Sequence, residues 1–174
     1  MPAFINIFLV VVLILISFQD FKERQISWYL IPLTFIAFLL RAINNGAADS
    51  LIQNTLLNAA FIALQLLLLT IYMSIKNKKM VNIVNEYLGL GDLLFFIVLC
   101  VAFSPINFIV FYLLSTFITL ISFIAYRILS KKVTVEIPLA GAMASMLIIL
   151  MLSGTLMPQL NFYDDTHWIN IIKL

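Results

Sequence analysis

The sequence predicts an all-α protein that crosses a lipid bilayer several times. Of its 174 residues, 64% are hydrophobic and 10% are charged, and the mean hydropathy is +1.13. Soluble domains are roughly half apolar and a quarter charged, so this composition excludes a water-soluble domain. The apolar residues form unbroken runs, such as the leucines at 66–69, rather than the alternating pattern of a transmembrane barrel. We therefore expect the spans to be helices.

Six apolar stretches approach the roughly 20 residues that a helix needs to cross about 30 Å of hydrocarbon. They cover residues 3–18, 29–43, 51–75, 88–104, 106–129 and 137–157. Residues 3–18 are expected to remain in the mature protein, because neither a positive segment nor a small-x-small cleavage site flanks them. Residues 93–129 are nearly continuous, but one helix of that length would measure about 55 Å. A break is therefore expected at Pro105, which has the polar neighbours Ser104 and Asn107.

The basic residues predict which ends of the spans face the cytoplasm. Six spans place both termini on one side and the loops after the first, third and fifth spans on the other. These loops hold eight of the ten Lys and Arg residues: Lys22, Arg24, Lys76, Lys78, Lys79, Arg127, Lys131 and Lys132. Because basic loops are retained in the cytoplasm, we expect these loops inside and both termini outside. Arg41, near the outer end of the second span, is expected to extend toward the outer headgroups.

Residues 1–157 are expected to form one six-helix membrane domain, since they contain no internal repeat and no low-complexity linker. Residues 158–174 are expected to form a short outer tail that lies on the membrane, anchored at the interface by Tyr163 and Trp168. The net charge of +2 gives no indication of nucleic-acid binding. The lipid bilayer is therefore the first partner that the sequence predicts.

Two acidic residues stand beside predicted spans on the same side of the membrane. Asp20 directly follows the first span, and Asp92 lies at the start of the fourth. An ionised carboxylate inside the bilayer costs on the order of 3 kcal/mol, so an acid near a span needs a reason. Two neighbouring carboxyls tend to share one proton, so that one acts as a base and the other as an acid. Such a pair can split a peptide bond with water, and we predict Asp20 and Asp92 as catalytic residues.

Neither a metal nor another cofactor is expected. One Cys and one His are too few for a Cys-based zinc site or a catalytic transition metal. His167 with Asp164 and Asp165 lacks the spacing of a ligand set. The two-carboxylate reaction itself requires no metal ion.

Gly89 and Gly91 precede Asp92 in a Gly-Leu-Gly-Asp sequence. Glycine lacks the side chain that would keep an extended substrate backbone away from Asp92, so both glycines are predicted to bind substrate. The alternative is structural: Asp20 ends one helix and Asp92 stabilises the N-terminus of another, where the helix dipole favours a negative charge. The residue types alone leave both interpretations open.

Three segments together resemble the type IV prepilin peptidases and preflagellin peptidases, which are intramembrane aspartic proteases of the Gly-x-Gly-Asp type. The first is residues 20–28, an Asp after a span followed by basic residues and an Ile. The second is residues 89–92, and the third is residues 137–142, a Pro-containing turn with small residues. Residues 27–28 read Ser-Trp where the family usually has Pro-Asn, and Leu94 stands where many relatives have Lys.

The resemblance implies an aspartic endopeptidase of the prokaryotic inner membrane whose active site faces the cytoplasm. It implies pilin-like precursors as substrates, cut between a basic leader peptide and a hydrophobic helix. Pro138 and Glu86 become candidate substrate-binding residues, Glu86 by attracting the basic leader; a solvated loop acid is the alternative for Glu86. One Cys cannot form the cysteine-rich module with which many relatives methylate the cut product, so no methyltransferase activity is expected.

Two other functions stay open at this point. A six-span ligand-binding subunit of a small-molecule importer has a similar size and span number, with the acids in structural roles. An inactive relative of the peptidases can serve as an assembly scaffold, which Ser27 and Leu94 allow.

Overall fold

The computed structural model describes the chain except for residues 1, 87, 131–136, 157–160, 167 and 169–174. The described residues form seven helices and no strand, which confirms the all-α prediction. The helices are α1 (Pro2–Glu23), α2 (Leu30–Asn44), α3 (Ala48–Asn77), α4 (Ile83–Glu86), α5 (Leu90–Ala102), α6 (Pro105–Ser130) and α7 (Leu139–Leu156). All except the single turn α4 correspond to the predicted apolar stretches.

Three helical segments are long and apolar enough to cross a membrane, judged by length and composition: Ala3–Glu23, Ala48–Asn77 and Pro105–Ile128. The apolar parts of α2, α5 and α7 are shorter. The 13 residues of α5 rise about 20 Å, which is less than the roughly 30 Å of hydrocarbon. The chain is thus a multi-pass membrane protein, while the six-span topology and the outward-facing termini stay predictions.

The predicted break between the fourth and fifth stretches is confirmed, because α5 ends at Ala102 and α6 begins at Pro105. Proline is favoured at the first helical position, where its missing N–H would have no partner. The buried Asn58 side chain of α3 donates hydrogen bonds of 2.9 Å to the carbonyl oxygens of Cys100 and Phe103. It therefore satisfies carbonyl groups that the end of α5 leaves without helical partners.

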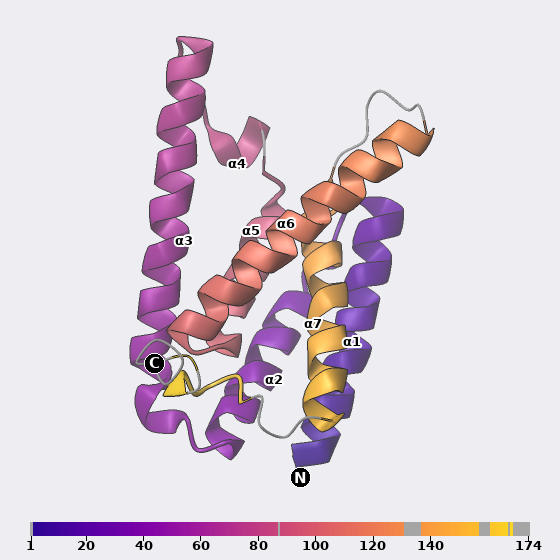
Figure 1. Cartoon of the computed structure of the whole chain (residues 1–174), viewed down its shortest axis with the longest axis vertical. Coiled ribbons are helices and arrows are strands. Elements are labelled where there is room, and N and C mark those ends of the chain that lie inside the picture. Colours follow the sequence, from indigo (N-terminus) through magenta and orange to yellow (C-terminus); the bar gives the residue numbers. More distant parts are fainter. Residues whose placement is uncertain (1, 87, 131–136, 157–160, 167, 169–174) are drawn as a thin grey trace.

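The helices form a bundle in which α2 and α5 lie between α1 and α3 (Figure 1). α7 packs along α1, and α6 crosses the bundle diagonally, in contact with α3 and α7 (Figure 1). The core consists of aliphatic and aromatic side chains from most of these helices, among them Leu9, Leu13, Ile16, Phe38, Phe95, Leu99, Phe108, Met143 and Leu147.

α1 and α7 approach each other closely because α7 carries small residues where the two helices meet. The first turns of α7 contain Ala140, Gly141, Ala144 and Ser145. Small side chains let helix backbones come close together within a membrane. The Ser145 hydroxyl forms a 2.6 Å hydrogen bond with the hydroxyl of Ser17 on α1. This contact fixes the last turns of α1 against the first turns of α7.

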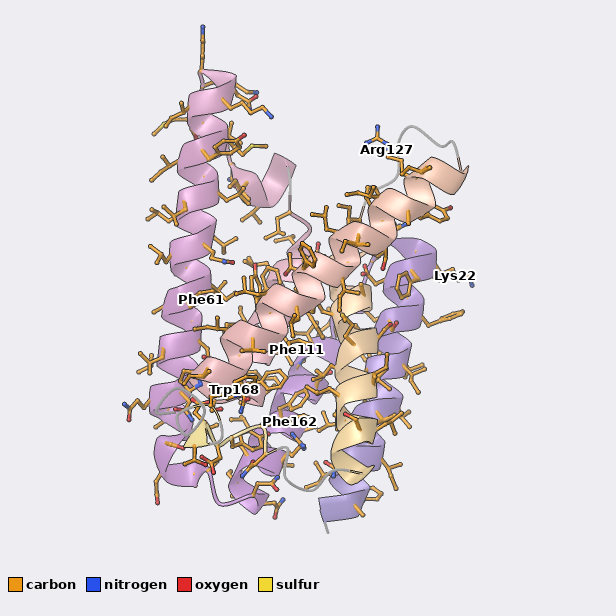
Figure 2. The ribbon with its side chains drawn as sticks, in the orientation of Figure 1. Lys22, Phe61, Phe111, Arg127, Phe162 and Trp168 are labelled. Carbon is orange, nitrogen blue, oxygen red and sulfur yellow. The ribbon has the colours of Figure 1, made fainter. Side chains whose placement is uncertain are left out.

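The described part of the tail packs into the protein at one end of the bundle. Figure 2 shows Phe162 and Trp168 at this end, away from Lys22 and Arg127. The Phe162 ring lies 5.3 Å from the Phe103 ring, and the Arg41 guanidinium carbon lies 4.3 Å from the Phe162 ring centre. A guanidinium over an aromatic face is an attractive cation–π contact, which strengthens when it is shielded from water.

Two expectations about this end are therefore wrong. Tyr163 is buried rather than exposed as an interfacial anchor. Arg41 binds Phe162, and its Nε donates a 3.0 Å hydrogen bond to Oδ1 of Asn6, so it does not extend toward headgroups. The reason is that the tail folds back onto the bundle, so that the Arg41 guanidinium carbon lies 4.3 Å from the Phe162 ring centre and 5.5 Å from that of Tyr163. Residues 169–174, the end of the tail that was expected to lie on the membrane, are outside the described residues.

Asp165 in the tail caps the N-terminus of α6. Its carboxylate accepts a 2.6 Å hydrogen bond from the Ser104 hydroxyl and 3.2 Å hydrogen bonds from the backbone amides of Ile106 and Asn107. These amides belong to the first turn, where no helical partner exists. The Trp168 indole also donates a 2.7 Å hydrogen bond to Oδ1 of Asn107. The tail thus closes the end of the bundle at which α6 begins.

Candidate active site

The two predicted carboxylates meet at the N-terminus of α7. The backbone amide of Ala140 donates a 2.8 Å hydrogen bond to Oδ1 of Asp92. The next amide along the chain, that of Gly141, donates a 2.6 Å hydrogen bond to Oδ2 of Asp20. Because the two donors are neighbours in the sequence, the two carboxyls lie side by side, close enough to interact electrostatically. The structure therefore brings Asp20 and Asp92 together from helices α1 and α5.

The end of α7 is suited to hold negative charge. The first amides of a helix have no carbonyl partner within the helix, and they carry the positive end of the helix dipole. Ala140 and Gly141 are the second and third residues of α7, so both amides are of this kind. Two carboxylates can satisfy them at once, which offsets part of the cost of burying these acids.

Asp20 lies in the last turns of α1 and is only 7% exposed. α1 ends just beyond it, where Arg24 takes a left-handed conformation with φ 55°. Asp20 is in close contact with Gly141: a Cβ atom at position 141 would lie 2.9 Å from both Cβ and Oδ2 of Asp20. Any side chain there would push Asp20 away, so this site requires glycine.

Asp92 lies in the first turn of α5, which begins at Leu90 after the extended residue Gly89. The two glycines of the motif each leave room for another group of the protein. A Cβ at position 89 would lie 3.3 Å from Oδ2 of Asp92, and a Cβ at position 91 would lie 3.2 Å from Cδ1 of Ile26. Gly89 therefore gives space to the carboxyl of Asp92, and Gly91 lets α5 pack on the loop that follows α1. A contact of either glycine with substrate stays a prediction.

Pro138 lines a cavity of about 480 Å³ whose lining residues include neither Asp20 nor Asp92. It also comes directly before α7 and accepts a 3.0 Å hydrogen bond from the amide of Ala142, so it belongs to the same helix end. The other wall residues of the cavity include Phe21 and Arg24, which follow Asp20 in the sequence. Glu86 is the last residue of α4, and its side chain lies outside the described part of the structure.

Arg24 is a residue at this site that the sequence reasoning did not select. Arg24 lines the same cavity and lies close enough to Asp20 to interact with it electrostatically. Its buried Nη1 atom has no hydrogen-bond partner in the described part of the chain. Burying a guanidinium N–H group without a hydrogen-bond acceptor costs folding free energy, so the conformation of Arg24 is unusual. The signal in the sequence is the basic residue four positions after Asp20, which belongs to the first of the three motifs.

Ala140 and Gly141 were also missed as site residues, although they lie inside the third motif. They act through backbone amides, and residue types do not reveal which amides will face a carboxylate. Within the described residues, no group of three or more His, Cys, Asp and Glu side chains is placed to bind a metal ion. The site thus offers two adjacent carboxyls, two amide donors and a cavity at the same helix end.

The departures from the family motifs lie away from these contacts. The Trp28 and Leu94 side chains are exposed, and the Ser27 amide donates a 2.9 Å hydrogen bond to the side-chain oxygen of Gln19. None of these three residues takes part in the hydrogen bonds that hold the acid pair. The differences therefore leave the arrangement of Asp20 and Asp92 intact.

Comparison with known proteins gives one match. Residues 7–124 match the type IV leader peptidase family, a segment that contains Asp20 and Asp92 and ends before α7. No curated protein and no solved structure matches the chain. The match covers more than half of the chain and confirms the family that the three motifs predict.

Proposed function

The chain belongs to the type IV leader peptidase family, and we propose that it is an aspartic endopeptidase whose catalytic residues are Asp20 and Asp92. Membership implies a peptidase that acts on leader peptides in a membrane setting. The observation that carries the proposal is that consecutive amides of α7 hold both carboxyls side by side. The importer alternative gains no support from this family.

In the proposed reaction the pair shares one proton. The ionised carboxyl takes a proton from a water molecule, whose oxygen attacks the carbonyl carbon of the scissile peptide bond. The protonated carboxyl gives its proton to the carbonyl oxygen, which yields a neutral tetrahedral intermediate. The C–N bond then breaks as the leaving amine takes a proton from the pair. One hydroxyl of the intermediate gives its proton back to the pair as the carbonyl re-forms, which leaves a carboxylic acid and restores the shared proton. Each carboxyl accepts one hydrogen bond from an α7 amide, and the carboxyl of Asp92 also interacts with the backbone of Gly89.

We propose that the cut lies at the cytoplasmic face and separates a basic leader peptide from the hydrophobic helix of a pilin-like precursor. The basic loops support this orientation, because Arg24 comes four residues after Asp20 and because Lys22 and Arg127 lie at the end of the bundle away from Phe162 (Figure 2). In this orientation both chain termini face outward, in a prokaryotic inner membrane. Residues 1–157 then form the peptidase domain and residues 158–174 its outer tail.

The test is cleavage of a precursor with a basic leader, co-expressed with the wild type, Asp20→Asn or Asp92→Asn. Each variant should lose cleavage while still inserting into the membrane, because an amide has the size of the acid but cannot share a proton. Asp49→Asn is the matched control, since Asp49 is exposed in the first turn of α3. A chelator should leave the wild-type rate unchanged.

Full cleavage by either active-site variant would disprove the two-acid mechanism. Failure of the wild type with every leader-bearing precursor would favour the remaining alternative, an inactive scaffold in which the acids only cap α7.

A further inference from the structure

The protein places a cation beside one member of the acid pair. Arg24 follows the last residue of α1, and its amide donates a 3.1 Å hydrogen bond to the carbonyl oxygen of Asp20. The Arg24 guanidinium is close enough to the Asp20 carboxyl to interact with it electrostatically. Its buried Nη1 atom has no hydrogen-bond partner among the described residues. The two side chains therefore interact as charges rather than through this donor.

Arg24 also lies beside the helix end that holds the two acids. It lines the cavity of about 480 Å³ together with Ala142 and Ser145 of α7. These two residues come one and four positions after Gly141, whose amide binds the carboxyl of Asp20. The guanidinium is thus held near the first turns of α7, on the side of the pair that Asp20 occupies.

We propose that Arg24 is a positioning residue that keeps the negative charge of the acid pair on Asp20. Asp20 is then the base that takes a proton from water, and Asp92 is the acid that gives its proton to the carbonyl oxygen of the scissile bond. This inference rests on the proposed peptidase function and assigns the two roles within it. The amides of α7 do not make this distinction, because each carboxyl accepts a hydrogen bond from one of them.

The helices packed against α1 bring no other charge to Asp20. α7 and α2 both pack on α1. α7 has no ionisable residue, and the only one on α2 is Arg41, in its last turn. Arg41 contacts Phe162 at the opposite end of the bundle. The charge that acts on Asp20 from a neighbouring cation therefore comes from the segment that follows α1.

Other ionisable side chains at this end belong to α1, α5 and α6. Within the described residues of these helices they are Lys22, Glu23, Asp92, Tyr126 and Arg127. Lys22, Glu23 and Arg127 are exposed, and the Lys22 Nζ atom lies 5.5 Å from the centre of the Phe18 ring. Tyr126 lines the cavity together with Arg24. Neither Lys22 nor Arg127 thus replaces Arg24 as the partner of Asp20.

Asp92 interacts with a different set of groups. Within the described residues, those that act on its carboxyl are the backbone of Ala140, the backbone of Gly89 and the carboxyl of Asp20. A backbone amide carries only a partial positive charge, whereas a guanidinium carries a full charge throughout the pH range of an enzyme assay. A negative charge on Asp20 also disfavours a second one on Asp92. The shared proton therefore belongs on Asp92.

Burial makes this assignment depend on Arg24. Asp20 is only 7% exposed, whereas Asp92 is partly exposed. Because burial disfavours the charged form of a carboxyl, Asp20 would hold the proton if no cation were near it. Arg24 has φ 55°, a left-handed conformation that glycine adopts after a helix without steric cost. The chain thus has a strained arginine where its charge acts on the more buried acid.

The inference is tested by the pH profile of kcat/KM, which reports the ionisation of the free enzyme. Arg24→Gln removes the charge, and Arg24→Lys keeps it. Arg127→Gln is the control, because Arg127 is exposed at the end of the bundle where Lys22 lies (Figure 2). Each variant is assayed in vesicles with a soluble leader peptide that ends a few residues after the cut. If Asp20 is the acid that ionises first, losing the cation moves only the acidic limb, to higher pH.

We expect Arg24→Gln to lower kcat/KM on the acidic limb about tenfold and to leave the alkaline limb in place. Arg24→Lys should restore the acidic limb, and Arg127→Gln should move neither limb. Movement of the alkaline limb instead would mean that Asp20 holds the proton in the active form, and it would overturn the inference. An equal loss at every pH would mean that Arg24 has only a structural role, and it would overturn the inference as well.

Chemical labelling provides a second measurement that does not depend on turnover. Dicyclohexylcarbodiimide adds to a protonated carboxyl, and the acyl group then migrates to nitrogen, which leaves an N-acylurea that mass spectrometry locates. In a pH series, the wild type should lose labelling of Asp20 at lower pH than labelling of Asp92. In Arg24→Gln these two pH values should lie closer together.

If the wild type lost labelling of Asp92 first, or if Arg24→Gln left both pH values unchanged, the inference would be overturned. The wild-type series alone can give the first of these results, so the test does not depend on folding of the variant. If the wild type cuts no leader peptide, the proposed function fails, and the labelling still determines which acid holds the proton.

Discussion

Gly141 and Asp20 are in closer contact than any other residue at position 141 would permit. The Gly141 amide donates a 2.6 Å hydrogen bond to Oδ2 of Asp20, and a Cβ atom on Gly141 would lie 2.9 Å from Cβ of Asp20. The same Cβ would lie 3.2 Å from the carbonyl oxygen of Ser17. Asp20 lies on α1, is only 7% exposed and is packed where α1 contacts α7.

Gly141→Ala should therefore reduce cleavage strongly. A displacement of a catalytic group by about 1 Å can cost about 100-fold in rate, and we expect a loss of kcat of that order. The measurement is the initial rate of precursor cleavage per amount of inserted protein. Gly154→Ala on the same helix is the control, since its Cβ would lie 3.9 Å from Phe162, an ordinary contact. Equal loss in both variants would mean that helix α7 tolerates no substitution of glycine, and the specific role of Gly141 would be refuted.

The pH dependence of kcat/KM should be bell-shaped. At low pH both carboxyls carry protons and no base is present, whereas at high pH both are ionised and no acid is present. The maximum belongs to the state in which Asp20 and Asp92 share one proton. The profile is measured with the soluble leader peptide, so that substrate insertion does not contribute. If kcat/KM fell on only one side of the pH profile and stayed constant on the other, a single ionisation would be enough for activity, and the shared-proton mechanism would be contradicted.

Asp165→Ala should destabilise the protein by about 1–2 kcal/mol, the usual range for losing a helix N-cap. The cause is the loss of the acceptor for Ser104 and for the first amides of α6. Thermal unfolding in detergent measures the effect, and the activity of the folded fraction should persist. Asp164→Ala is the control: Asp164 is exposed, and its carboxylate accepts hydrogen bonds from the amide and the hydroxyl of Thr166, which lower the pKa of that carboxyl. An equal change in both variants would argue against the cap.

Asn58→Ala should cost about 1–3 kcal/mol of unfolding free energy, because it leaves two buried carbonyl groups without a donor. Gln53→Ala, at an exposed position of the same helix, should change it by less than about 0.5 kcal/mol. Chemical denaturation in mild detergent distinguishes the two. If Asn58→Ala were as stable as Gln53→Ala, the α5 carbonyls would have found another partner, and the importance of Asn58 for the break would be disproved.

The sequence predicts the helices well because apolar length and a single proline determine them. The runs of Leu, Ile and Phe mark six helices within a few residues, and Pro105 marks the break. The pairing of Asp20 with Asp92 was also foreseeable, since the distribution of lysines places both at the same membrane depth. These signals depend on local composition, which one sequence displays directly.

The sequence predicts the details of the site less well because backbone groups and distant partners determine them. The amides of Ala140 and Gly141 hold the acids, and no residue type encodes that role. Arg41 was expected in the headgroups, yet Phe162, which is far away in the sequence, covers it. Contacts of this kind depend on how the tail and α7 fold back on the bundle. Periodicity and charge do not specify them.

The shared helix end also determines what can vary elsewhere in the molecule. Neighbouring Cα atoms in a polypeptide are about 3.8 Å apart whatever their side chains are. Because adjacent amides of α7 bind the two acids, the separation between the carboxyls of Asp20 and Asp92 follows from one peptide unit of α7. Substitutions at lipid-facing and loop positions can therefore accumulate without changing the separation of the two carboxyls, as long as the first turn of α7 is kept.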